Sequence, residues 1–167
     1  MPVQGTVVLH SSIQAWQIIE EKQRKVFKLQ DGDIVIGLVR PERRNVGILM
    51  DSGTDIVGTP DGIAVVRVKK NAAGITQEYL FAALRSGEAR IQLWTESGGT
   101  SYGKLRNDHI LNLRLRHPGL DEVRNITTAV RDWKKATRSS MALWDEIGTE
   151  ADRTPIIKSP MFGLEPE

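Results

Sequence analysis

The three histidines are the residues from which metal or acid–base chemistry would most readily be built, and their spacing does not favour it. His10, His109 and His117 show neither an HxxxH nor an HExxH pattern, so no two imidazoles are expected to share a helix face. The chain contains no cysteine, which removes thiolate nucleophiles, disulfides and cysteine-based metal sites. We therefore expect His109 and His117 to be surface or capping residues.

Motifs for phosphoryl or acyl transfer are also absent from the sequence. Gly98-Gly99 is too short for a Walker loop, no GxGxxG follows a candidate strand, and no GxSxG nucleophile elbow occurs. The sequence therefore predicts a protein that is not an enzyme and that has no catalytic residues, metal or cofactor of its own.

One nuclease-like pattern is an alternative. Pro60-Asp61 followed by an acidic-x-Lys triplet would resemble a magnesium-dependent nuclease, in which carboxylates hold the ion and lysine orients the attacking water. The candidate triplet Asp132-Trp133-Lys134 falls on a predicted helix, where a strand is needed, and Glu20-Glu21-Lys22 precedes Asp61. Neither geometry fits, so a metal-dependent nuclease is the weakest of the alternatives.

The formal net charge of +2 conceals an uneven distribution of charge. Between residues 145 and 167 there are six acidic side chains against Arg153 and Lys158, which gives −4 and leaves +6 for residues 1–144. A basic body suits a polyanion such as double-stranded DNA. The alternative is an ordinary solvated surface with a slight excess of lysine and arginine.

Cationic and hydroxyl side chains gather in three candidate turns, from which they could contact DNA. Guanidinium and ammonium groups pair with phosphates, and arginine can also reach O6 and N7 of guanine. Hydroxyl groups add contacts to the DNA backbone or to bases. The candidate DNA-binding residues are Arg40, Arg43, Arg44, Lys69, Lys70, Thr100, Ser101, Tyr102 and Lys104.

Short strands and helices must position these turns. A polar segment over residues 11–29 predicts a helix, although its apolar pattern is sparse. Thr76 is a good N-cap for another helix, and residues 97–103 form a glycine-rich loop. A second short helix is expected over residues 89–94, and strands over residues 34–39, 46–50, 63–68 and 110–116. The expected fold class is α+β, with a curved, mostly antiparallel sheet and short packing helices.

The last third of the chain predicts one long helix over residues 119–148, ended by Gly148. Its 3-4 spacing of seam positions is typical of a coiled coil. Those positions are Val123, Ile126, Val130, Trp133, Thr137, Ser140, Trp144 and Ile147. All except Thr137 and Ser140 are apolar, and we expect these six to dock a second copy or another protein. The alternative is a helix that folds back onto its own sheet. The expected organisation is therefore a domain over residues 1–118, this helix, and an acidic, proline-containing tail over residues 149–167.

Six segments, in this order, resemble the target-recognition domains of DNA specificity subunits from type I restriction-modification systems. The segment 31–36 with Arg40-Pro41 resembles the family's "GDIL-S-x-RP" segment. Residues 56–68 are similar to a strand pair of the family, and residues 76–86 are similar to its "peYLyyLLrS" helix. Residues 97–101 resemble its "GST" loop, and residues 105–115 resemble the strand that follows this loop. The residues from Leu120 onward are similar to its conserved helix.

The resemblance implies a non-catalytic protein that recognises half of a bipartite site in double-stranded DNA. In the family, long helices pair as a spacer and dock the DNA methyltransferase subunits, which carry the chemistry. Two departures stand out: the usual proline-rich link is reduced to residues 117–123, and the chain has one recognition domain and one long helix instead of two of each. A homodimer formed through the C-terminal helix would restore both and recognise a symmetric site.

The main rival is a protein-interaction adaptor with the same fold, in a defence complex, that no longer binds DNA. It predicts that the long helix matters and that charge reversal at Arg43 and Arg44 changes nothing. No apolar run approaches the roughly 18 residues of a membrane helix, and the absence of cysteine fits a reducing compartment. We therefore expect a cytoplasmic protein without membrane partners.

Overall fold

The computed structural model of the chain describes residues 7–10, 16–18, 27–43, 45–50, 57–58, 61–70, 72, 74–98 and 103–153. Its contacts divide the chain into two compact units, residues 1–131 and 132–167. We call the first unit the head and describe each unit by itself.

The centre of the head is a four-stranded antiparallel sheet with the strand order β2-β7-β4-β5. These strands are β2 (Trp16–Ile18), β4 (Ile34–Gly37), β5 (Val46–Ile48) and β7 (Ile63–Val68). Two antiparallel pairs accompany the sheet: β1 (Val7–His10) with β8 (Arg114–His117), and β3 (Phe27–Lys28) with β6 (Val57–Gly58). The predicted strands over residues 34–39, 46–50 and 63–68 are confirmed in place.

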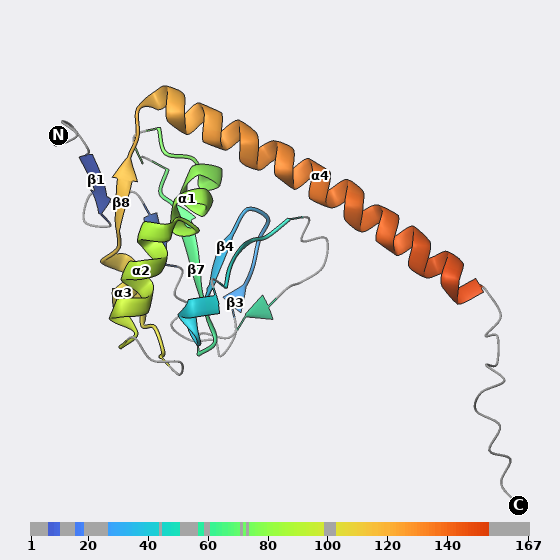
Figure 1. The fold of residues 1–167 in the computed structure, drawn as a ribbon, viewed down its shortest axis with the longest axis horizontal. Coiled ribbons are helices and arrows are strands. Elements are labelled where there is room, and N and C mark those ends of the chain that lie inside the picture. Colours follow the sequence, from blue (N-terminus) through green and yellow to red (C-terminus); the bar gives the residue numbers. More distant parts are fainter. Residues whose placement is uncertain are drawn as a thin grey trace, which may run out of the picture. The chain divides into compact units, whose positions relative to one another are not determined.

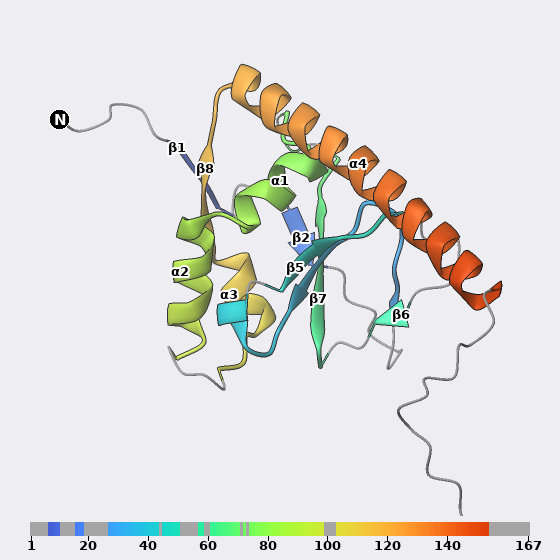
Figure 2. The same ribbon diagram turned by 45° about the vertical axis from the view of Figure 1, so that its right-hand side comes forward.

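A short helix lies between β4 and β5, and the other helices of the described chain follow β7. They are the 3-10 helix η2 (Pro41–Arg43), α1 (Gln77–Leu84), α2 (Gly87–Glu96), α3 (Asn107–Leu111) and α4 (Leu120–Arg153). In the head, α1 lies between the four-stranded sheet and the β1–β8 pair, and α2 packs beside η2 and α3 (Figure 1 and Figure 2). The expectation of a mixed α+β fold with an antiparallel sheet and a long C-terminal helix is confirmed.

Side chains of successive strand residues enter two different apolar layers, one on each face of the sheet. Ile34 and Ile36 of β4 and Val66 of β7 are buried in the main core, which α1 and α2 cover. Val65, one residue away from Val66, joins a smaller cluster with Leu29. Because successive strand residues point to opposite faces, the sheet is apolar on both sides at its centre.

A buried ion pair fixes the turn that precedes β4. Asp33 is 1 % exposed, and its carboxylate accepts hydrogen bonds from Nε of Arg67, from Nη2 of Arg67 at 2.7 Å and from the backbone N–H of Gln30 at 2.9 Å. Gly32 has a φ of 83°, in the left-handed region that favours glycine. The turn predicted at residues 31–33 therefore depends on a long-range charge pair as well as on local chemistry.

Two glutamine side chains complete the hydrogen bonding of strand edges. Gln77 accepts from the N–H of Val68 at 2.8 Å and donates to the carbonyl of Val66 at 3.0 Å. Gln92 does the same on β8, accepting from Arg114 N–H at 2.9 Å and donating to its carbonyl at 2.8 Å. Each amide takes the place of a neighbouring strand, so α1 and α2 are tied to the strands they cover.

The first three turns of α4 belong to the head and pack onto α1. Val123 is 4 % exposed, and Ile126 and Val130 pack against the main core. The hydroxyl of Thr127 shares a hydrogen bond of 2.6 Å with that of Thr76, the residue that caps α1. Because the head covers these seam residues, the expectation that they face a partner is not met. For this stretch the alternative of a helix folded onto its own domain is correct.

Three sequence-based boundaries are wrong. The helix predicted over residues 11–29 contains strand β2, since Trp16 and its neighbours pair with β7 and Trp16 is 1 % exposed. Residues 110–111 end helix α3, and the strand begins only at Arg114. Gly148 lies inside α4, because one helical glycine costs only about 1 kcal/mol relative to alanine. In the described part of the chain, no helix combines the length and apolarity needed to cross a membrane.

We expect the substitution Asp33→Asn to lower the free energy of unfolding by about 2–3 kcal/mol, because it leaves the Arg67 guanidinium without its anion. Chemical denaturation measures the change. The control Glu96→Gln alters an exposed carboxylate and should stay within about 0.5 kcal/mol of wild type. Equal stability of the two variants would show that the ion pair does not hold the turn.

Candidate nucleic-acid interface

The basic turn after β4 has an unusual backbone. Arg40 has a φ of 55°, the only positive value at a non-glycine residue in the described part of the chain. An arginine in the left-handed region costs more than a glycine would, and such outliers concentrate at functional sites. The conformation turns the chain directly into η2, where Arg43 is exposed.

Backbone pairing brings a second basic segment to this turn. The N–H of Arg40 donates to the carbonyl of Gly103 at 3.2 Å, and the N–H of Leu105 donates to the carbonyl of Leu38 at 2.8 Å. Between them, Val39 and Lys104 form an antiparallel bridge. Lys104, whose side chain is exposed, is thereby placed one strand spacing from the turn that holds Arg40.

The glycine-rich loop is closed at its base by a tight approach. A Cβ added to Gly103 would lie 2.6 Å from Oγ and 2.7 Å from the carbonyl oxygen of Ser97, which leaves no room for a side chain. Ser97 Oγ also donates to the carbonyl of Trp94 at 2.7 Å. The first residue of the loop, Ser97, lies against its last residue, Gly103, and Gly103 accepts a hydrogen bond from Arg40. Both ends of the loop therefore lie beside the basic turn.

The predicted DNA-binding residues do not all come together. Arg40, Arg43 and Lys104 share one end of the sheet, and we call these three the basic end. Lys69 and Lys70 follow β7, whose antiparallel register pairs Ile63 with Gly37 at the basic end and Val66 with Ile34 toward the other. Counted along β7, the two lysines thus lie about 20 Å from the basic end. Lys69 and Lys70 therefore lie apart from the basic end, because adjacent antiparallel strands end at opposite edges of the sheet. Arg44, Thr100, Ser101 and Tyr102 lie outside the described residues.

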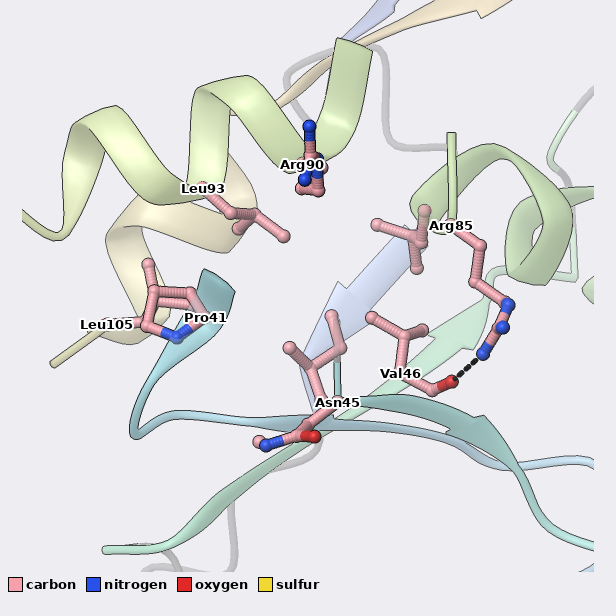
Figure 3. Close-up of a pocket in the computed structure, with 10 residues that line it drawn as sticks. Pro41, Asn45, Val46, Arg85, Arg90, Leu93 and Leu105 are labelled. Carbon is pink, nitrogen blue, oxygen red and sulfur yellow. Dashed lines mark hydrogen bonds between the residues drawn. The ribbon is translucent and has the colours of Figure 1, made fainter. Parts of the chain in front are cut away.

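Helix α2 adds a cation that sequence reasoning missed. Arg90 is exposed on α2, which packs against η2, and Figure 3 shows it with Leu93 on α2 above Pro41 and Leu105. The nearby Arg85 is engaged differently: its Nη1 donates to the carbonyl of Val46 at 2.8 Å. Arg90 carried no sequence signal, because an isolated exposed arginine on a helix looks like any solvated residue.

A charged pair lies close in sequence to Lys104 of the basic end. Arg106 donates from Nε and Nη2 to the two carboxylate oxygens of Asp108, at 3.0 and 2.9 Å. These hydrogen bonds lower the pKa of Asp108 below its ordinary value. The ring Nδ1 of His109 accepts from the N–H of Arg106 at 3.5 Å, so His109 caps α3, in line with its predicted capping role.

In the second unit, α4 exposes large apolar side chains. Trp133 is 46 % and Trp144 is 69 % exposed, and Met141 and Leu143 are each 58 % exposed. Of the eight seam positions, Trp133 and Trp144 are therefore the described large residues that remain accessible for docking. The side chain of Ile147 lies outside the described part of the structure.

Asp132 and Lys134 of the nuclease-like triplet lie on helix α4, as the sequence predicts. Among the described residues, no group of three or more His, Asp or Glu side chains is arranged to hold a metal ion. No family model matches the sequence, and no significant match was found among curated proteins.

We expect Gly103→Ala to destabilise the protein by about 1–3 kcal/mol, because the new Cβ meets the backbone of Ser97. The matched control is Gly47→Ala, where an added Cβ has nothing within 4 Å. Thermal unfolding of both variants measures the difference. An equal melting temperature for the two would mean that the base of the loop is not closed as described.

Proposed function

We propose that this protein is a sequence-specific DNA-binding specificity component of a restriction-modification system, comparable to half of a type I specificity subunit. The head is then a target-recognition domain for one DNA half-site. Helix α4 docks a second copy or a methyltransferase subunit, and those partners carry the chemistry. An antiparallel sheet followed by one long helix supports this proposal, since the resemblance in the sequence implies that order.

The observation that carries the proposal is the convergence of Arg40, Arg43 and Lys104. These residues come from two distant segments that backbone hydrogen bonds hold together. Guanidinium and ammonium groups on turns at one end of a sheet suit phosphates, and Arg40 or Arg43 can extend to base edges. Arg90 on the adjacent helix enlarges the same cationic surface.

The exposed part of α4 suits a second copy in antiparallel orientation. Its seam runs Trp133, Thr137, Ser140, Trp144, which is the same pattern of aromatic, polar, polar, aromatic in both directions. An antiparallel pair would place Trp133 of one copy opposite Trp144 of the other and the polar residues at the centre. Large exposed aromatic side chains of this kind are common anchors of protein interfaces.

The charges on the same stretch favour that orientation. Its first half carries Lys134, Lys135 and Arg138, and its second half carries Asp145, Glu146 and Glu150. Two antiparallel copies would set basic halves against acidic halves, whereas two parallel copies would set like charges side by side. The sequence of the helix therefore supports a homodimer with two-fold symmetry, which would recognise a symmetric DNA site.

We expect Arg43→Glu and Lys104→Glu each to weaken duplex DNA binding by about tenfold or more and to reduce the salt dependence of log K by about one unit, as the loss of a phosphate contact does. Fluorescence anisotropy with a labelled duplex at several salt concentrations measures both quantities. Lys70→Glu is the control at the opposite end of the sheet and should change neither. If all three variants bind like wild type, the adaptor without DNA binding becomes the better account.

We expect Trp144→Ala to weaken self-association by about 30-fold, the usual scale for removing a central aromatic anchor. Sedimentation equilibrium measures the monomer–dimer constant. Trp94→Ala removes a tryptophan that is 45 % exposed on the head and serves as the control, with no change expected. A wild-type protein that stays monomeric until a methyltransferase is added would assign the seam to that partner instead.

The orientation has its own measurement, which the absence of native cysteines makes simple. A spin label on Thr149→Cys would be separated from its copy by roughly 30 Å in the antiparallel pair, from the helical rise of about 1.5 Å per residue. A parallel pair would hold the two labels at about the helix spacing of 10 Å. Electron–electron distance measurements distinguish the two, and the short distance would reject the antiparallel arrangement.

A further inference from the structure

A groove lined largely by small and aliphatic side chains lies on the head. It has a volume of about 390 Å³ and is formed by α1, the start of α2, strand β8 and the first turns of α4. Its partly or fully exposed lining includes Ala82, Ala83, Gly87, Glu88, Glu122 and Ile126. Because α1 and α2 present alanine and glycine here, the groove has room for the larger side chains of another segment.

The groove has an excess of negative charge. Glu88 is paired with Arg116 at 2.9 Å, whereas Glu122 is exposed and has no ion-pair partner among the described residues. Burial raises the pKa of Tyr79, which lines the groove, and the negative charge of Glu122 raises this pKa further. The charge of Glu122 therefore acts on the groove. An occupant that combines aliphatic side chains with a cation is complementary to it.

One segment of this chain has that composition, residues 153–158 with the sequence RTPIIK, which we call the docking segment. It contains two cations and two isoleucines, and all six acidic side chains of residues 145–167 lie outside it. Pro155 disfavours a continued helix, which agrees with the end of α4 at Arg153. The docking segment is thus a basic and aliphatic stretch in an otherwise acidic part of the sequence.

The antiparallel pairing of α4 proposed above brings the docking segment of one copy to the groove of the other. Opposing Trp133 with Trp144 also opposes Thr137 with Ser140, so one register satisfies both pairs. Continued along the helix, this register places Ala151 of the second copy level with Ile126, which lines the groove. Helix α4 of the second copy ends two residues later, and its docking segment would then pass Glu122.

The docking segment of the same copy is too far away to occupy the groove. Ile126 and Arg153 are 27 residues apart in one continuous helix, which corresponds to about 40 Å at a rise of about 1.5 Å per residue. Residues 154–157 span at most about 14 Å when fully extended. The occupant must therefore come from another molecule.

We propose that the docking segment of a second copy binds in this groove, with its isoleucines against Ala83 and Ile126 and with Lys158 facing Glu122. The inference rests on the homodimer of the proposed function, because only the antiparallel orientation of α4 delivers the segment. Two such contacts, related by the two-fold axis, extend the interface from the helix seam onto both heads.

Disulfide trapping between two single-cysteine variants tests the contact directly, since the wild-type chain has no cysteine. Gly87→Cys places a thiol in the groove, and Ile157→Cys places one in the docking segment. An added Cβ at Gly87 has nothing within 4 Å, and the same holds at the control position Gly47 of β5, which does not line the groove. When separately tagged full-length variants are mixed under oxidising conditions, Gly87→Cys should form at least about tenfold more mixed disulfide with Ile157→Cys than Gly47→Cys forms. Equal yields for the two pairs would overturn the proposal.

Charge reversal tests the role of Glu122. Glu122→Lys and Lys158→Glu should each weaken self-association by about tenfold, because each sets like charges together in both symmetry-related contacts. The double variant restores opposite charges and should recover to within about twofold of wild type. Glu96→Lys changes an exposed carboxylate outside the groove and is the matched control. Sedimentation equilibrium measures all four variants, and a double variant as weak as either single one would contradict the contact.

Duplex binding by the same samples separates this inference from the proposed function. Dimers that bind duplex DNA and weaken with Trp144→Ala, but give no disulfide specific to Gly87→Cys, overturn the groove contact alone. A specific disulfide without duplex binding supports the contact and rejects the DNA-binding role. A wild-type protein that stays monomeric overturns the contact as well. Protection of the Gly87→Cys thiol only by an added methyltransferase would assign the groove to that protein instead.

Discussion

The pairing of residues 38–40 with residues 103–105 is the interaction on which the candidate site depends. Two backbone hydrogen bonds and the Val39–Lys104 bridge join the end of β4 to the segment that follows the glycine-rich loop. Neither segment has regular structure of its own at this point, so their mutual pairing satisfies both backbones. Without it, Arg40 and Lys104 would be unrelated surface charges. The left-handed Arg40 and the side-chain-free Gly103 are the two residues whose backbones make the approach possible.

The long helix α4 has two parts with different surroundings. Val123, Ile126 and Val130 complete the main core, while Thr127 joins the cap of α1. Beyond Arg131 the helix carries its large apolar residues on the surface, Trp144 among them. One continuous heptad pattern thus serves an intramolecular interface first and leaves an exposed seam afterwards. A partner, whether a second copy or a methyltransferase, would find the helix already anchored at one end, which reduces the conformational entropy lost on docking.

Much of the fold was predictable, because local signals and tertiary structure agree in those places. The turn at residues 31–33, the β-branched runs of β4 and β7 and the cap at Thr76 each specify their own element. Strand β2 was not predictable, since its three residues form a strand only by pairing with β7. The same holds for the site. The sequence identifies Arg40, Arg43 and Lys104 as candidates, but only the register of β7 separates Lys69 and Lys70 from them.

The most direct measurement of the central claim is an NMR titration of the labelled protein with a duplex that contains its half-site, or with random-sequence duplex at low salt. The account predicts that amide signals of residues 38–43 and 103–105 shift together and saturably, while those of residues 69–70 stay in place. Shifts confined to residues 69–70, or no shifts at any salt concentration, would contradict the assignment of the basic end as the DNA-binding surface.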